Sequence, residues 1–137
     1  DEITLPEISE IVSQYASIPE VRSKLVVLQR KMSEKYNVIM DGRDIGTVVL
    51  KDSKFKFFLT ATPEERARRR FTELVNRGID VNYDKLLEDI IKRDYIDSHR
   101  EVDPLKKADD AIEIDSSNYN INEVTEIICN FIENALQ

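Results

Sequence analysis

The stretch from Met40 to Val49, MDGRDIGTVV, decides the fold class of this 137-residue chain. It begins in a short apolar run at 38–40 that ends in Asp41-Gly42. A short apolar run broken by glycine is typical of a buried strand that gives way to a loop. Open α/β sheets bind their ligands at the carboxyl ends of such strands. We therefore expect a ligand site around this loop.

Two further apolar runs predict strands, one at 55–60 (FKFFLT) and one at 111–114. Apolar residues at helical spacing lie before, between and after these runs, and helix-start signals at Thr62, Asn82 and Asn120 mark where three of the helices begin. Strands that alternate with helices predict an α/β fold with a parallel sheet flanked by helices. Three strands make a small sheet, so the sheet is expected to be incomplete.

Composition narrows the class of protein. Hydrophobic residues make up 41% of the chain and charged residues 34%, which is typical of a globular domain. The net charge of -7 argues against a nucleic-acid partner. There is no apolar run near the ~20 residues of a membrane-spanning helix, so no membrane partner is expected. One cysteine and one histidine exclude an internal disulfide and a zinc set, and we expect a cytoplasmic protein.

The loop after the first predicted strand carries groups that suit a nucleotide. Gly42 lets the backbone turn without a side chain in the way. Arg43 offers a forked donor suited to phosphate, and the carboxylate of Asp44 can accept hydrogen bonds from a base or a sugar. The alternative is a turn in which these residues serve only backbone geometry. The residues alone do not choose between the two.

A second cluster is ERARRR, from Glu65 to Arg70. Arg66 and Arg70 are one helical turn apart and therefore share a helix face. A polyphosphate would compensate their mutual repulsion. Taken by itself, the charge pattern favours the alternative, a solvated face neutralised by neighbouring glutamates.

A third cluster is RDYIDSHR, from Arg93 to Arg100. Arg93, Asp97 and Arg100 follow the spacing i, i+4 and i+7, so they project from one helix face. They can form an intrahelical ion-pair ladder, or they can clamp a phosphate with the arginines and bind a sugar hydroxyl with Asp97. Spacing leaves both interpretations open.

Taken together, these segments resemble the bacterial-type cytidylate kinase family. The resemblance runs from about Leu5 to the last helix, and its strongest parts are DGRDIGTVV, FFLTATPEERARRR, NRGIDVNYDKLLEDIIKRD and REVDPLKKADDAIEIDSS. It implies a P-loop nucleoside monophosphate kinase-like fold. It also implies transfer of the terminal phosphoryl of ATP to CMP or dCMP with Mg²⁺. Residues 1–36 would be the end of the monophosphate-binding region with its connecting helix, and 37–137 the rest of the core, with a lid near 71–100.

The resemblance also assigns roles in binding the acceptor nucleotide. Ser13 and Arg22 match positions that recognise cytosine, and Asp44 matches a residue that helps to read the base. Arg93 and Asp97 match positions that recognise the pentose.

Other residues match positions at the phosphates. Arg43 would bind the acceptor phosphate, and Arg100 would be a further arginine of the acceptor site. Arg66 and Arg70 would hold ATP near the lid, and Asp41 would orient Mg²⁺ through water. The resemblance therefore makes Asp41, Arg43, Arg66 and Arg70 the residues closest to the chemistry.

One part of the family pattern is missing. The chain contains no GxxxxGK[ST] motif, and none of its three glycines is followed by lysine. The family opens with a strand and this P-loop, so we expect a C-terminal portion that lacks the central strand of the sheet and is inactive by itself. Unpaired strand edges would then favour self-association or repacking. The alternatives are a non-catalytic nucleotide-binding or interaction module, and a kinase directed to UMP or AMP.

Overall fold

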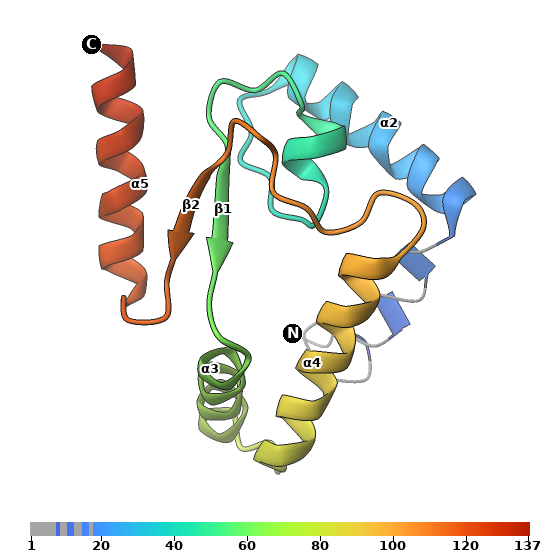
Figure 1. Cartoon of the computed structure of the whole chain (residues 1–137), viewed down its shortest axis with the longest axis vertical. Coiled ribbons are helices and arrows are strands. Elements are labelled where there is room, and N and C mark those ends of the chain that lie inside the picture. Colours follow the sequence, from blue (N-terminus) through green and yellow to red (C-terminus); the bar gives the residue numbers. More distant parts are fainter. Residues whose placement is uncertain (1–7, 9–10, 13–14, 17) are drawn as a thin grey trace. The chain divides into compact units, whose positions relative to one another are not determined.

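The computed structural model describes residues 8, 11–12, 15–16 and 18–137 (Figure 1). Helices and strands alternate along this part of the chain, as the α/β prediction requires. The elements in chain order are α2 (Pro19–Lys35), the π-helix η2 (Ile45–Val49), β1 (Phe57–Thr60), α3 (Pro63–Asn76), α4 (Tyr83–His99), β2 (Ile112–Asp115) and α5 (Ile121–Leu136).

The two strands form a parallel sheet. Phe57 lies opposite Ile112 and Thr60 opposite Asp115. The ladder continues past the end of β2, where the Ser116 amide donates to the Thr60 carbonyl over 2.7 Å. Parallel neighbours need a long crossover connection, and α3 and α4 supply it. The predicted strands at 55–60 and 111–114 are therefore confirmed.

The predicted strand at 38–40 is wrong. Residues 37–41 have no regular secondary structure, and Ile39 is fully exposed. A strand persists only when its amides and carbonyls pair with a neighbour. Within the described residues, the sheet consists of β1 and β2 alone, and neither strand pairs with this segment.

Short-range signals set the ends of α3 as predicted. Thr62 Oγ1 accepts a hydrogen bond from the Glu65 amide at 3.2 Å, which satisfies one of the free amides of the first turn. At the other end, Gly78 takes a φ of 75°, and the Ile79 amide donates to the Leu74 carbonyl. Glycine adopts this left-handed conformation without steric cost.

The starts of α4 and α5 also follow the sequence. Asn82 accepts a hydrogen bond from the Lys85 amide at 2.9 Å. Asn120 and Glu123 form a reciprocal capping box, in which each side chain accepts from the backbone amide of the other residue.

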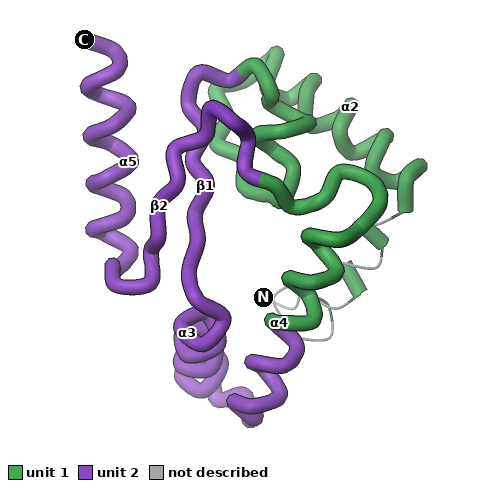
Figure 2. The backbone as a smooth tube through the Cα atoms, in the orientation of Figure 1, with its two compact units in different colours: residues 1–52, 91–106 green, residues 53–90, 107–137 purple. Residues whose placement is uncertain are grey.

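The chain divides into two compact units (Figure 2). Unit 1 comprises residues 1–52 and 91–106, and unit 2 comprises residues 53–90 and 107–137. Each unit is described separately below. The predicted boundary after residue 36 follows from the family resemblance and stays a prediction.

In unit 2, α5 packs against the sheet, and α3 contacts the start of α4. Ala67 and Leu74 on α3 are completely buried. The rings of Phe57 on β1 and Phe131 on α5 lie 6.4 Å apart, which places α5 against the sheet. Phe71 contacts Tyr83 edge to face, and this contact joins α3 to the first turn of α4.

In unit 1, α2 packs against η2, and Arg30 joins them. The Arg30 guanidinium donates to the Val48 carbonyl at 2.6 Å and to the Val49 carbonyl at 3.2 Å. These carbonyls lie at the carboxyl end of η2, where a helix leaves acceptors unpaired. Arg30 therefore holds the segment after the DGRD loop against α2.

We predict that Arg30→Ala lowers the free energy of unfolding by about 1–2 kcal/mol, because two carbonyls lose a charged donor. The side chain is exposed, so water recovers part of the loss. Urea unfolding of Arg30→Ala and of the control Lys31→Ala, which alters an exposed neighbour, measures the effect. Equal midpoints for both variants would show that the two hydrogen bonds are immaterial.

Candidate functional site

A buried ion pair links α2 to the DGRD loop in unit 1. Arg22 is 8% exposed and Asp44 is 7% exposed. Nη2 of Arg22 pairs with Oδ2 of Asp44, and Nε of Arg22 donates to Oδ2 of Asp103 at 3.1 Å. Nη1 donates to the Ala16 carbonyl at 3.3 Å. Buried charges are tolerated only when they are paired and hydrogen-bonded, and this guanidinium has a partner on each nitrogen.

A second ion group centres on Asp97 of α4. This residue is 4% exposed, and its Oδ2 accepts a hydrogen bond from Arg43 Nε at 2.8 Å. Arg93 Nε lies 3.8 Å from the same oxygen. One buried carboxylate therefore holds two arginines that the sequence places 50 residues apart. The ion pair between Arg93 and Asp97, expected for an intrahelical ladder, is therefore present. The ion pair with Arg43 adds a link between α4 and the DGRD loop.

Arg100 connects the two groups. Its Nε donates to the Asp103 carbonyl at 2.7 Å. Burial lowers the pKa of Arg100, and the nearby charge of Arg22 lowers this pKa further, while Asp97 and Asp44 oppose the change. Arg100 therefore interacts electrostatically with residues of both ion groups.

We call this set of side chains the arginine–aspartate network. Its members are Arg22, Arg43, Asp44, Arg93, Asp97, Arg100 and Asp103. The sequence predicted all of them as site residues except Asp103. The structure brings the six predicted residues together within unit 1, and their roles toward ligands stay predictions. Ser13, predicted to recognise cytosine, lies outside the described residues.

The loop that supplies Arg43 and Asp44 is tightly turned. A Cβ atom at Gly42 would lie 2.9 Å from Cγ1 of Ile45, closer than carbon atoms normally approach. The glycine thus lets the loop fold back onto the first residue of η2. This agrees with the prediction that Gly42 lets the backbone turn without a side chain in the way.

Asp41 offers one exposed carboxylate to a metal. No group of three or more metal-ligating side chains is present among the described residues. Mg²⁺ commonly takes one or two protein carboxylates and fills its other positions with water and substrate phosphates. Asp41 fits that pattern as a single contributor beside a phosphate-bound ion.

The predicted ATP arginines lie on α3, in unit 2. Arg70 pairs with Glu73 at 2.7 Å, and Glu65 binds both Arg68 and Arg69 at 2.8 and 2.7 Å. The glutamates of the helix therefore neutralise much of this face, as the charge pattern favoured. Arg66 is half-buried on the same helix. The roles of Arg66 and Arg70 toward ATP stay predictions.

Arg69 has a structural role that its spacing did not reveal. Its Nη2 donates to the Ser116 carbonyl at 2.5 Å and to the Tyr119 carbonyl at 3.4 Å. It therefore ties α3 to the turn between β2 and α5. The partners lie 47 and 50 residues away, so no local pattern signals the contact.

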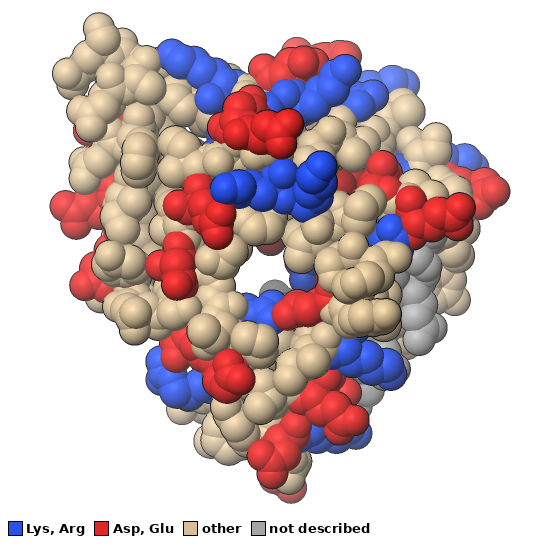
Figure 3. Space-filling view, viewed as in Figure 1, with Lys and Arg blue, Asp and Glu red and all other residues tan. Residues whose placement is uncertain are grey.

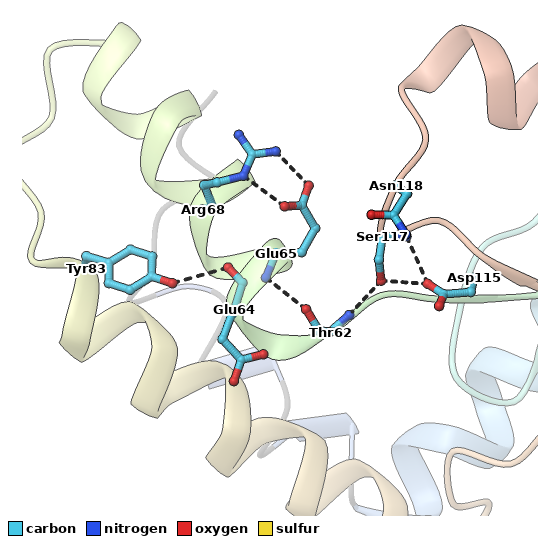
Figure 4. Close-up of a pocket in the computed structure, with 8 residues that line it drawn as sticks. All are labelled: Thr62, Glu64, Glu65, Arg68, Tyr83, Asp115, Ser117 and Asn118. Carbon is cyan, nitrogen blue, oxygen red and sulfur yellow. Dashed lines mark hydrogen bonds and ion pairs between the residues drawn. The ribbon is translucent and has the colours of Figure 1, made fainter.

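An open polar pocket lies beside this turn (Figure 4). Its lining residues are Thr62, Glu64, Glu65, Arg68, Tyr83, Asp115, Ser117 and Asn118. Three carboxylates and one guanidinium line the pocket, a balance of charge that disfavours a phosphate. The polar groups also bind one another: Ser117 Oγ contacts Asp115 Oδ1 at 2.6 Å. None of the predicted site residues lines this pocket.

Glu65 gives a pH-dependent prediction. Hydrogen bonding to Arg68 lowers the pKa of Glu65 from 4.5 to about 2. A carboxylate with a lowered pKa in the folded state contributes stability that is fully present above pH 4.5 and is lost as pH falls towards 2. We expect Glu65→Gln to be less stable than the wild type at pH 7, and the difference to disappear across that window. Thermal unfolding between pH 2.5 and 7 measures it, with Glu126→Gln as an exposed control. A constant difference would contradict the prediction.

The charges on the face drawn in Figure 3 are mixed in sign, and basic side chains do not gather into a single patch there. Among the described residues, no helix is both long and apolar enough to cross a bilayer.

A parallel pair of strands joined by a helical crossover defines an α/β protein, and its unit 1 carries the buried arginine–aspartate network. The chain also matches the family model described as cytidylate kinase over residues 1–134. It therefore belongs to the cytidylate kinase family.

Curated relatives agree with this assignment. The chain is 66% identical to a cytidylate kinase of Clostridium perfringens over 96% of its own length and 60% of the relative's. It is 62% identical to one of Clostridium acetobutylicum, over 99% of the chain and 63% of the relative. It is 57% identical to a cytidylate kinase of Clostridium tetani, over 99% of the chain and 60% of the relative. The chain thus spans about 60% of the length of these relatives.

Proposed function

We propose that this chain is the acceptor-binding and core portion of a kinase that transfers the terminal phosphoryl of ATP to CMP or dCMP. The observation that carries the proposal is the buried arginine–aspartate network of unit 1, in a member of the cytidylate kinase family. The relatives whose length the chain partly covers are named cytidylate kinases, and this activity is inferred from them.

The network suits recognition of a nucleoside monophosphate. Arg43 and Arg93 have partly exposed side chains while the carboxylate that holds them is buried, so Asp97 fixes their direction and leaves each side chain partly accessible to a ligand. Fixed cations of this kind stabilise a phosphate without reorganising when charge develops. Arg22 and Asp44 present a donor and an acceptor side by side, which matches the mixed edge of cytosine. A bound base would exchange part of their mutual ion pair for hydrogen bonds to itself.

Phosphoryl transfer needs positioning and charge neutralisation more than a covalent nucleophile. Mg²⁺, bound with ATP, would neutralise the phosphate oxygens, and Asp41 would hold its water shell. Arg43 would bind the acceptor phosphate, and Arg66 and Arg70 on α3 would hold the phosphates of ATP. Arg70 would then exchange its ion pair with Glu73 for the ligand.

The chain by itself is expected to be inactive. Without a glycine-rich loop that ends in lysine, the β- and γ-phosphates have no cradle of backbone amides. In the complete kinase, the strand that leads into this loop would pair with the free edge of β1. In its absence, the same edge favours association with a second copy. We also propose that the complete protein is cytoplasmic.

The test compares this chain with a longer form in which a segment carrying a glycine-rich loop that ends in lysine, taken from one of the longer relatives, is joined before Asp1. We expect the longer form to phosphorylate CMP and dCMP with Mg-ATP in a coupled assay, and to act weakly on UMP and AMP. Failure on CMP and dCMP would overturn the proposal. A preference for UMP or AMP would redirect it to another monophosphate kinase. Calorimetry on the chain alone tests the module alternative, which predicts binding of CMP without turnover in either form.

A further inference from the structure

Among the residues of the network, Asp103 has an unusual backbone conformation. Its φ is 48°, and it is the one non-glycine residue with a positive φ in the described part of the chain. Side chains other than glycine rarely adopt this conformation, although aspartate and asparagine tolerate it better than most. Such backbone conformations persist where surrounding contacts fix them, and they concentrate at functional sites.

The turned backbone lets one residue bind two arginines from different segments. The Asp103 carbonyl accepts hydrogen bonds from Nε and Nη2 of Arg100, three residues earlier. The Asp103 carboxylate accepts from Nε of Arg22, 81 residues away on α2. Carbonyl and carboxylate therefore bind separate partners at a residue with a positive φ.

The positive charges of Arg22 and Arg100 explain the need for a carboxylate at Asp103. Arg22 and Arg100 are close enough for the charge of one to lower the pKa of the other, so the two guanidinium groups repel. Asp44 is bound to Arg22 and compensates part of this repulsion. If a ligand base engages Asp44, the carboxylate of Asp103 becomes the partner that keeps Arg22 in place.

We propose that Asp103 is a positioning residue that holds Arg22 and Arg100 in the direction required for the acceptor nucleotide. The inference rests on the proposed function, because both arginines are assigned to acceptor binding there. Asp103 itself makes no contact with the reacting groups. Asp103 influences the affinity for the base and phosphate of the acceptor nucleotide, and it does not affect the affinity for ATP.

The test uses the longer, active form with Asp103→Asn and Asp103→Gly. Asparagine and glycine both accept a positive φ, so the backbone is retained, and glycine relieves its strain. Both lose the negative charge. We expect KM for CMP to rise roughly tenfold in both variants, as a charge-assisted hydrogen bond is removed. KM for ATP should stay within twofold, and the preference for CMP over UMP should fall. Asp109→Asn, an exposed aspartate outside the network, is the matched control.

The outcomes separate this inference from the proposed function. A wild-type protein that fails to phosphorylate CMP overturns the function itself. An active wild type with an unchanged KM for CMP in both variants overturns only the role of Asp103. A fall in kcat with both KM values unchanged also overturns it, because that result reports fewer folded molecules. KM does not depend on the folded fraction, so partial unfolding cannot imitate the expected result.

Discussion

Replacing Arg22 by methionine is expected to lower the free energy of unfolding by about 3–5 kcal/mol, because it leaves a buried carboxylate without its partner. Arg22 and Asp44 are both less than a tenth exposed, so water cannot reach the abandoned charge easily. Asp103 loses its partner in the same substitution. Lys24→Met, on the exposed face of α2, is the control and should change the stability little.

The two partners of this ion pair are expected to lose different amounts of stability when each is replaced. Asp44→Asn leaves Arg22 bound to Asp103, so it should cost less than Arg22→Met. The double variant removes both buried charges and should be more stable than Arg22→Met alone. Urea unfolding followed by circular dichroism gives the three values at pH 7. A double variant no more stable than Arg22→Met would show that the two charges are not coupled in the folded protein.

Local signals correctly predicted where α3, α4 and α5 begin and where α3 ends, because these signals act between residues close in sequence. Thr62, Asn82 and Asn120 each bind an amide three residues later, and Gly78 permits the left-handed turn after α3. The two confirmed strands also share a mechanism, since each is an apolar run that finds a parallel partner. The run at 38–40 is also apolar, but it has no partner among the described residues and stays irregular. Composition predicts that a segment is able to form a strand, whereas pairing decides whether it does.

The network shows the same division. Helical spacing placed Arg93 and Asp97 on one face, and the structure adds Arg43 to the same carboxylate. The family resemblance named the six predicted members. Two of the ion pairs among them, Arg22–Asp44 and Arg43–Asp97, span 22 and 54 residues of sequence, beyond the reach of periodicity. Asp103 carried no signal because its role depends on a backbone angle and on a partner on α2. The structural role of Arg69 was not predicted for a related reason. Its partners are main-chain carbonyls, and a pattern of side chains does not indicate which carbonyls will lie nearby.

Asp97→Asn is expected to lower kcat/KM for CMP by roughly 100-fold in the longer form, because misplacing a binding group by about an ångström costs that much. The substitution keeps the shape of the side chain and removes its charge. Arg43 then loses the acceptor that fixes its direction, and Arg93 loses the nearby compensating charge. The buried amide also cannot satisfy both arginines, so we expect a loss of about 1–3 kcal/mol in the free energy of unfolding.

The comparison of CMP with dCMP separates two ways in which Asp97 can act. If its carboxylate binds a sugar hydroxyl that dCMP lacks, Asp97→Asn should harm CMP far more than dCMP. If it acts by anchoring Arg43, both acceptors should lose activity equally, because both carry the phosphate that Arg43 is proposed to bind. The short Arg43 contact, to a carboxylate that is almost completely buried, favours the second result. Asp89→Asn, on an exposed turn of the same helix, is the control, and equal activity of the two variants would contradict any role of Asp97.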